Sequence, residues 1–115
     1  MKNRIIAPVV AMVFLAAASL ASGAIAAGNP ERGAEKAKQV CAACHGAEGN
    51  APIAPEYPRL AGQYADYLSK ALRDYKSGAR KNAIMGAQAA GLSAQDMQDL
   101  AAYFSGLHGS LTVIQ

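Results

Sequence analysis

The residues best suited to chemistry are two cysteines and a histidine, which stand together as Cys41-Ala42-Ala43-Cys44-His45. The chain contains only these two cysteines. If the segment turns as a helix, residues three apart lie on one face, so both thiols point the same way. The imidazole of the next residue then projects to a different side, where it can bind a metal. The C-x-x-C-H form is the attachment signature of haem c, so we expect two thioether bonds and an axial histidine ligand here.

Three other uses of these residues remain open. A disulfide between Cys41 and Cys44 can form in an oxidising compartment, and can precede haem attachment. A thioredoxin-like redox pair needs a βαβ setting, and no stretch of the sequence alternates with the period of two that predicts strands. Half a zinc site needs two more ligands, and outside the motif only His108 and carboxylates are available. Haem attachment is the preferred interpretation.

Residues 1–26 are predicted to be a signal peptide. Lys2 and Arg4 form a short basic region, an apolar run follows, and Ala24-Ile25-Ala26 fits the small-x-small rule for cleavage. An uncleaved membrane anchor is the alternative, although the apolar run is shorter than the roughly 20 residues that a span needs. We therefore expect export to the periplasm and a mature domain of residues 27–115.

Cleavage changes the charge of the chain. The full sequence has 11 Lys and Arg against 8 Asp and Glu. Lys2 and Arg4 leave with the signal peptide, so 9 basic residues remain against 8 acidic ones. This balance, without any basic run, predicts no nucleic-acid partner. The mature domain is small and has no Trp, so few large side chains are available to form a hydrophobic core. A large apolar cofactor would fill the space that they leave.

Periodicity and capping signals predict three main helices joined by long loops. The first runs over residues 30–40, with Asn29 as N-cap and proline at its first position. The second covers about residues 62–76 and carries the apolar stripe, with Gly78 as its C′ residue. Ser93 opens the last with a capping box. The stripe of the second helix consists of Tyr64, Tyr67, Leu68, Ala71, Leu72 and Tyr75.

Two loops are expected between these helices. The first runs from Gly46 to Pro58 and contains three prolines, which fix φ and remove backbone donors. The second covers residues 80–86, with room for a short helical piece reaching Ala90. Met85 is expected in this second loop, where the backbone can present its thioether to a metal.

At this point the chain resembles the class I cytochromes c, especially the small periplasmic bacterial ones and the single-haem halves of their dihaem relatives. The resemblance spans essentially the whole mature chain. It implies an all-α cytochrome c fold, in which three main helices and long loops wrap around one covalently bound haem. It also implies a close glycine contact between the first and last helices, here Gly33 against Leu100 and Tyr103. The segments that carry the resemblance are the helix with Gly33 leading into CAACHG, PRLAGQ at 58–63, RKNAIM at 80–85 and LSAQDMQDLAAYF at 92–104.

The second axial ligand is chosen among Met85, Met97 and His108. Met97 lies on the apolar stripe of the last helix, where methionine is normally core filling. His108 lies at the end of that helix, as an exposed terminal histidine. Met85 precedes Gly86 outside any long helical stripe, and the resemblance aligns the distal methionine of the family with it. We expect His45 and Met85 to be the axial ligands of the iron.

Four further residues are predicted to surround the haem. The resemblance implies that the carbonyl of Pro58 accepts a hydrogen bond from the ligand histidine, which would fix the ring orientation. Arg59, Gln63 and Arg80 are candidates for the haem carboxylates, because buried carboxylates need charged or hydrogen-bonding partners. The alternative is that Pro58 only shapes its loop and that the other three are ordinary surface residues.

The expected function is single-electron transfer in the periplasm, between respiratory membrane complexes or dehydrogenases and terminal acceptors such as oxidases. His/Met ligation raises the haem potential and fills both axial positions, so the chain is expected not to be an enzyme. Its partners would be redox proteins and its mature form a soluble monomer, with membrane association left open. The alternatives are the haem subunit of a redox enzyme, and a gas-binding module in which Met85 dissociates.

Overall fold

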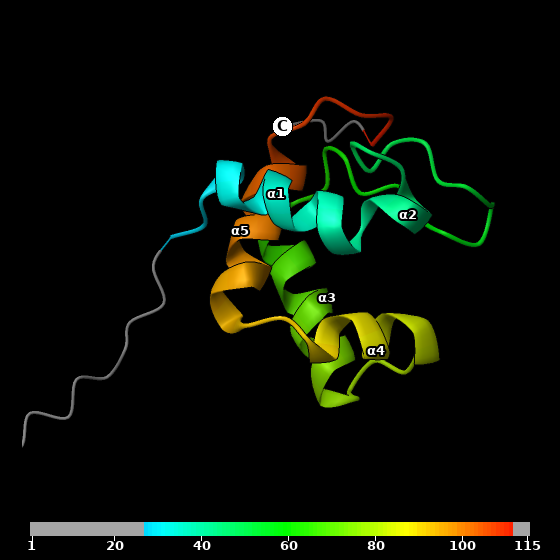
Figure 1. Ribbon diagram of the computed structural model, residues 1–115, viewed down its shortest axis with the longest axis vertical. Helices are drawn as coiled ribbons and strands as arrows, with labels where there is room; N and C mark the ends of the chain where they lie inside the picture. The colour runs from blue at the N-terminus through cyan, green and yellow to red at the C-terminus, as the bar shows by residue number, and fades with distance from the viewer. Residues whose placement is uncertain (1–26, 112–115) are drawn as a thin grey trace, which may run out of the picture.

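The computed structural model describes residues 27–111, so the predicted signal peptide and its cleavage site lie outside the described residues. Five helices follow one another along this part of the chain, and no β-strand occurs in it (Figure 1). They are α1 (Pro30–Val40), α2 (Ala42–His45), α3 (Ala65–Ser77), α4 (Ala83–Ala90) and α5 (Ala94–Ser105). Because all regular structure in this part of the chain is helical, the all-α prediction is confirmed. Residues 27–111 include no helix long and apolar enough to cross a membrane.

The first and last helices begin where their capping signals predict. The side chain of Asn29 accepts a hydrogen bond from Arg32 N, and Pro30 occupies the first position of α1. Ser93 and Asp96 form a complete capping box at the start of α5, because each side chain accepts the other's backbone N–H. These local bonds satisfy donors that a helix start leaves free, which is why short-range sequence is sufficient to place both ends.

α1 and α5 cross at closer range than side chains normally allow (Figure 1). A Cβ added to Gly33 would lie 2.0 Å from the carbonyl oxygen of Asp99 and 2.7 Å from Cβ of Tyr103. The predicted glycine contact is therefore present, but the nearest residues are Asp99 and Tyr103, and the expected Leu100 instead points into the core. Glycine is required because the backbone of α5 occupies the space of a side chain.

A charged group is buried beside this crossing. Asp99 is 4% exposed, and both of its oxygens are hydrogen-bonded. Nε and Nη2 of Arg32 donate to it at 2.7 and 3.0 Å, and Asn29 N and Gln95 Nε2 donate at 2.7 and 3.0 Å. The hydrogen bond from Arg32 is the main cause that lowers the pKa of Asp99 to about 2. This carboxylate thus ties the start of α1 to the middle of α5.

Asp99→Asn is expected to lower the melting temperature of the protein by about 5–10 °C at pH 7, because the charged hydrogen bonds are lost. The folded pKa lies below the unfolded value of about 3.9, so the contribution of Asp99 is complete above that value. It is lost as the pH falls toward about 2. The difference between variant and parent should therefore shrink in thermal melts below about pH 4.

Glu35→Gln is the matched control for that measurement, because its ion pair with Lys38 is exposed to solvent. It should change the melting temperature little at any pH. A melting difference for Asp99→Asn that stays constant from pH 7 to pH 2.5 would show that the carboxylate charge is not the source of the stability.

The middle helices differ from the prediction in two respects. α3 begins at Ala65 rather than near Gly62, because Gly62 has a φ of 83°, which is incompatible with a right-handed helix. The helix ends as predicted before Gly78, which has a φ of 81°. The segment predicted as a loop around Met85 is the first turn of α4, whose start is capped by Asn82. The alanines of this segment favour a helix enough to tolerate the single glycine within it.

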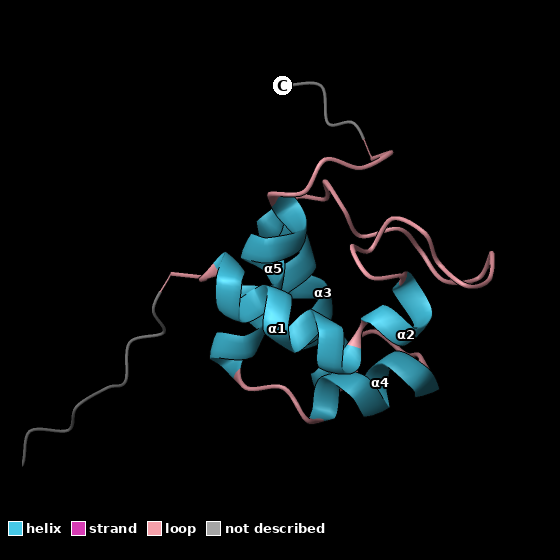
Figure 2. Cartoon of the chain, turned by 45° about the horizontal axis from the view of Figure 1, so that its top comes forward, coloured by secondary structure: helices cyan, strands magenta, loops and turns pink. Residues whose placement is uncertain are grey.

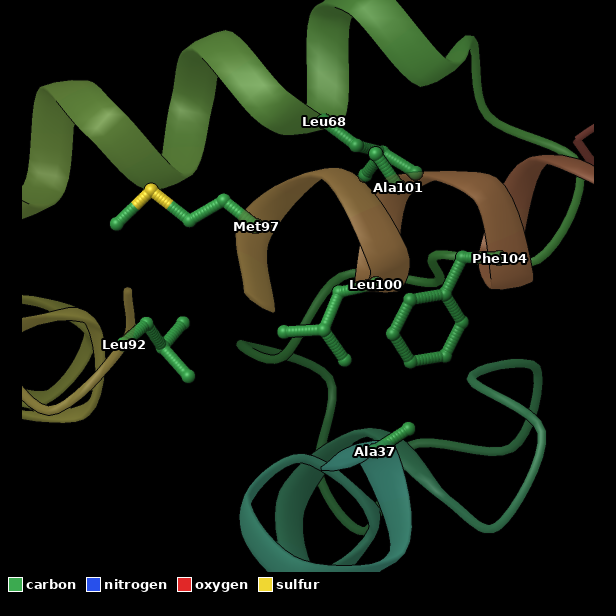
Figure 3. Packing of buried hydrophobic residues seen from close by; sticks show 7 residues of the cluster. All are labelled: Ala37, Leu68, Leu92, Met97, Leu100, Ala101 and Phe104. Atoms are coloured by element: carbon green, nitrogen blue, oxygen red, sulfur yellow. The ribbon is translucent and has the colours of Figure 1, made fainter. Parts of the chain in front are cut away.

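The core lies where α5 packs between α1 and α3 (Figure 3). Leu100 and Phe104 point from α5 toward Ala37 of α1, and Met97 is 2% exposed, as expected of a core methionine. Two residues of the predicted apolar stripe are not buried: Tyr64 and Tyr67 are 51% and 48% exposed. The cluster of buried residues contains Ala37, Leu68, Leu92, Met97, Leu100, Ala101 and Phe104. It leaves one side of α3 free to line a cavity.

Candidate haem site

The two cysteines and the histidine lie on one helical turn. The backbone N–H groups of Cys44 and His45 both donate to the carbonyl of Cys41, at 3.2 and 3.0 Å. Both thiols are free and half-buried. Burial raises the pKa of the Cys41 thiol to about 11, so it stays protonated at neutral pH. A reactive redox thiol has the opposite shift, and the described residues also provide no strand for a thioredoxin-like setting.

His45 is oriented by one hydrogen bond. It is 5% exposed, and its Nδ1 lies 2.7 Å from the carbonyl oxygen of Pro58. A carbonyl can only accept, so Nδ1 carries a proton in this hydrogen bond, and in the neutral ring the lone pair is then on Nε2. The ring of Tyr57 stands edge-on, at 6.0 Å between centroids and 72° between planes. The arrangement leaves Nε2 as the nitrogen available to a metal.

A cavity of about 460 Å³ opens beside this histidine. Cys41, His45 and Met85 all line it, although Met85 lies 40 positions after His45 in the chain. α2 and α4 lie at the same side of the molecule, and the loop that follows α2 extends from that side (Figure 2). The rest of its wall is largely apolar and includes Leu68, Leu72, Ile84, Leu100 and Phe104. The cavity thus joins a free imidazole nitrogen, a thioether and a thiol to an apolar space.

The predicted polar residues also line this cavity. Nη1 of Arg80 donates to the hydroxyl of Tyr67 at 3.2 Å, and its guanidinium lies 4.8 Å from the ring centroid of Tyr75. The cavity is also lined by Pro58, Arg59 and Gln63. Each of the four sequence-predicted partners is therefore at the cavity. Met97 and His108 are not among its lining residues.

Two contacts at the site carry no signal in the sequence. Arg59 donates to the hydroxyl of Ser110 at 2.9 Å, and Ser110 in turn contacts the side chain of Asn50. These residues are 51 and 60 positions apart, so no local pattern relates them. The contact of Tyr57 with His45 could not be predicted either, because the sequence does not indicate how an aromatic side chain in a proline-rich loop is oriented.

The donor set and the cavity fit a covalently attached haem, with Cys41 in the cavity wall and Cys44 on the same helical turn but outside the lining residues. The walls are apolar and carry two arginines, which suits an apolar macrocycle with carboxylate substituents. The alternative of a metal held by side chains alone has less support, because residues 27–111 contain no group of three or more His, Cys, Asp or Glu placed to hold one.

Comparison with known proteins agrees with this geometry. The family model described as Cytochrome c matches residues 30–108, and the chain belongs to this family of haem-binding electron-transport proteins. It is 50% identical over 80 residues to cytochrome c4 of Pseudomonas aeruginosa, covering 70% of this chain and 39% of that protein. It is 44% identical over 82 residues to cytochrome c-554(548) of Halomonas halodenitrificans, covering 69% of this chain and 96% of that protein.

A solved structure shows the same fold. The crystal structure of reduced recombinant cytochrome c4 from Pseudomonas stutzeri matches with a TM-score of 0.67 and 45% identity, over 73% of this chain and 48% of that one. The chain therefore spans about two fifths to one half of the cytochrome c4 proteins and nearly all of cytochrome c-554(548). The expected class I cytochrome c fold is confirmed.

Proposed function

We propose that this protein is a periplasmic single-electron carrier with one haem c, attached through Cys41 and Cys44 and ligated by His45 and Met85. The observation that carries the proposal is the orientation of His45. Its Nδ1–H donates to the carbonyl oxygen of Pro58, so Nε2 is the nitrogen available to bind a metal. His45 and Met85 line the same cavity. One C-x-x-C-H motif in the sequence supports one haem.

The residues of the chain divide the work between them. When bound, haem c supplies a one-electron iron couple. His45 is held in one tautomer by Pro58, which makes its Nε2 a better ligand. The apolar wall excludes water, and Arg59 and Arg80 provide positive charge for carboxylates. With His45 and Met85 both holding the iron, oxygen or peroxide would find no free ligand position, which favours electron transfer over substrate turnover.

The partners we propose are redox proteins, namely membrane respiratory complexes, oxidases or dehydrogenases. The predicted signal peptide at residues 1–26 supports the periplasm as the compartment, because it would direct the chain there for haem attachment. We also propose that the mature form is a soluble monomer. A role as the haem subunit of a redox enzyme, or as a gas-binding module, predicts different ligand chemistry and can be separated by measurement.

An optical and redox titration of the exported protein tests this function. We expect one reversible one-electron transition and an unchanged reduced spectrum on adding carbon monoxide. Rapid carbon monoxide binding by the untreated protein would instead support gas binding. Peroxide turnover as fast as electron exchange would support an enzyme, and either result would contradict the carrier.

A further inference from the structure

Arg59 lines the cavity and is bonded to Ser110, which lies 51 positions away in the sequence and is itself bonded to Asn50. Its Nη1 donates to Oγ of Ser110 at 2.9 Å. Ser110 in turn donates its backbone N–H and its hydroxyl to Oδ1 of Asn50, at 3.1 and 3.3 Å. The hydroxyl of Ser110 therefore directs its one proton to Asn50 and a lone pair to Arg59. A single oxygen joins the C-terminal segment, the loop after α2 and the cavity wall.

The backbone that carries these side chains is itself closely packed. A Cβ added to Gly109 would lie 2.4 Å from the carbonyl oxygen of Ala61, so the segment at residues 106–111 lies directly on the chain that follows Arg59. The carbonyl of Gly49 accepts the N–H groups of Leu60 and Ala61, at 2.6 and 3.1 Å. The positions of Asn50 and Ser110 relative to Arg59 are thus set by main-chain contacts.

This arrangement matters because Arg59 is an exposed side chain. Ordering a free arginine side chain costs rotamer entropy, so its charge is spread over many positions unless a partner selects one. A guanidinium held at the wall of the cavity disfavours additional positive charge on a metal there. Its position should therefore affect the electron affinity of the site.

We propose that Asn50 and Ser110 are positioning residues that hold the guanidinium of Arg59 at the cavity, where its charge favours the reduced iron and partners the haem carboxylates. The proposal rests on the haem site described above. It gives the C-terminal segment, which contributes no predicted ligand, a defined influence on the reduction potential.

The test uses the exported, haem-bearing protein and measures the midpoint potential of Ser110→Ala and Asn50→Ala at low and high salt. Each variant is expected to lower the potential, equivalent to an equilibrium constant for reduction smaller by up to about fivefold at low salt. High salt should reduce the difference, because it screens an exposed charge. Ser110→Thr keeps the hydroxyl and should restore the parent value. In NMR spectra, the side-chain signal of Arg59 should show greater motion in Ser110→Ala than in the parent.

Two further variants make the test decisive. Ser110→Ala in an Arg59→Gln background should cause no additional change, because the charge that it positions is absent. Arg73→Gln removes an exposed charge of α3 outside the cavity wall and should shift the potential less than Arg59→Gln. A Ser110→Ala protein with the parent potential at low salt, or one whose shift persists without Arg59, would overturn the proposal. Failure of the haem assignment would be seen separately, as an exported parent without covalent haem.

Discussion

A chain in which both Cys41 and Cys44 are replaced by Ala is expected to lose all of its haem on acid-acetone extraction, whereas the parent should keep its haem with the polypeptide. The reason is that thioether bonds survive acid and organic solvent, while coordination by His45 does not survive protonation of the imidazole. Absorbance of the extracted polypeptide at the haem band measures the result. Each single variant should retain covalent haem through the remaining thiol, in lower yield.

The two histidines supply the matched control for this site. His45→Ala removes the buried ring beside the cavity and should abolish the spectrum of a haem with two axial protein ligands. His108→Ala changes an exposed residue outside the cavity wall and should leave the spectrum and haem yield unchanged. Complete extraction of haem from the parent would contradict covalent attachment at these cysteines, whatever the variants do.

The parts of the fold that follow from short-range chemistry were predictable from sequence. Asn29 and Ser93 mark helix starts because their side chains accept backbone N–H groups three residues ahead. Gly78 marks a helix end because it can adopt a positive φ. The helical turn at Cys41 and His45 is local in the same sense. The placement of these signals therefore depends little on the rest of the molecule.

The features that the sequence analysis predicted wrongly or missed depend on tertiary contacts or on weak helix propensities. Met85 was expected in a loop, but an Asn82 cap and neighbouring alanines are sufficient to form α4. Tyr67 was expected in the core, but its helix face lines a cavity, so it is half exposed while it contacts Arg80. The link from Arg59 to Ser110 spans 51 positions, and only the folded chain creates it.

The helical setting of Met85 sharpens the prediction for that residue. It lies in the first turn of α4, where Asn82 accepts its backbone N–H at 2.9 Å, so its position is fixed by a cap. Met85→Ala is expected to lower the reduction potential by on the order of 0.1 V, because the thioether favours reduced iron. Loss of the ligand should also allow the reduced protein to bind carbon monoxide, which an optical titration detects.

Met97→Ala is the matched control, because the same substitution is made at a methionine of the core. Met97 is 2% exposed, so its truncation should lower the free energy of unfolding by about 2–5 kcal/mol through a cavity, with little change in potential. The two variants therefore separate ligation from packing. If Met85→Ala kept the parent potential and excluded carbon monoxide, another group would have to be the second axial ligand. The prediction is specific because a general loosening of the fold would affect Met97→Ala at least as strongly.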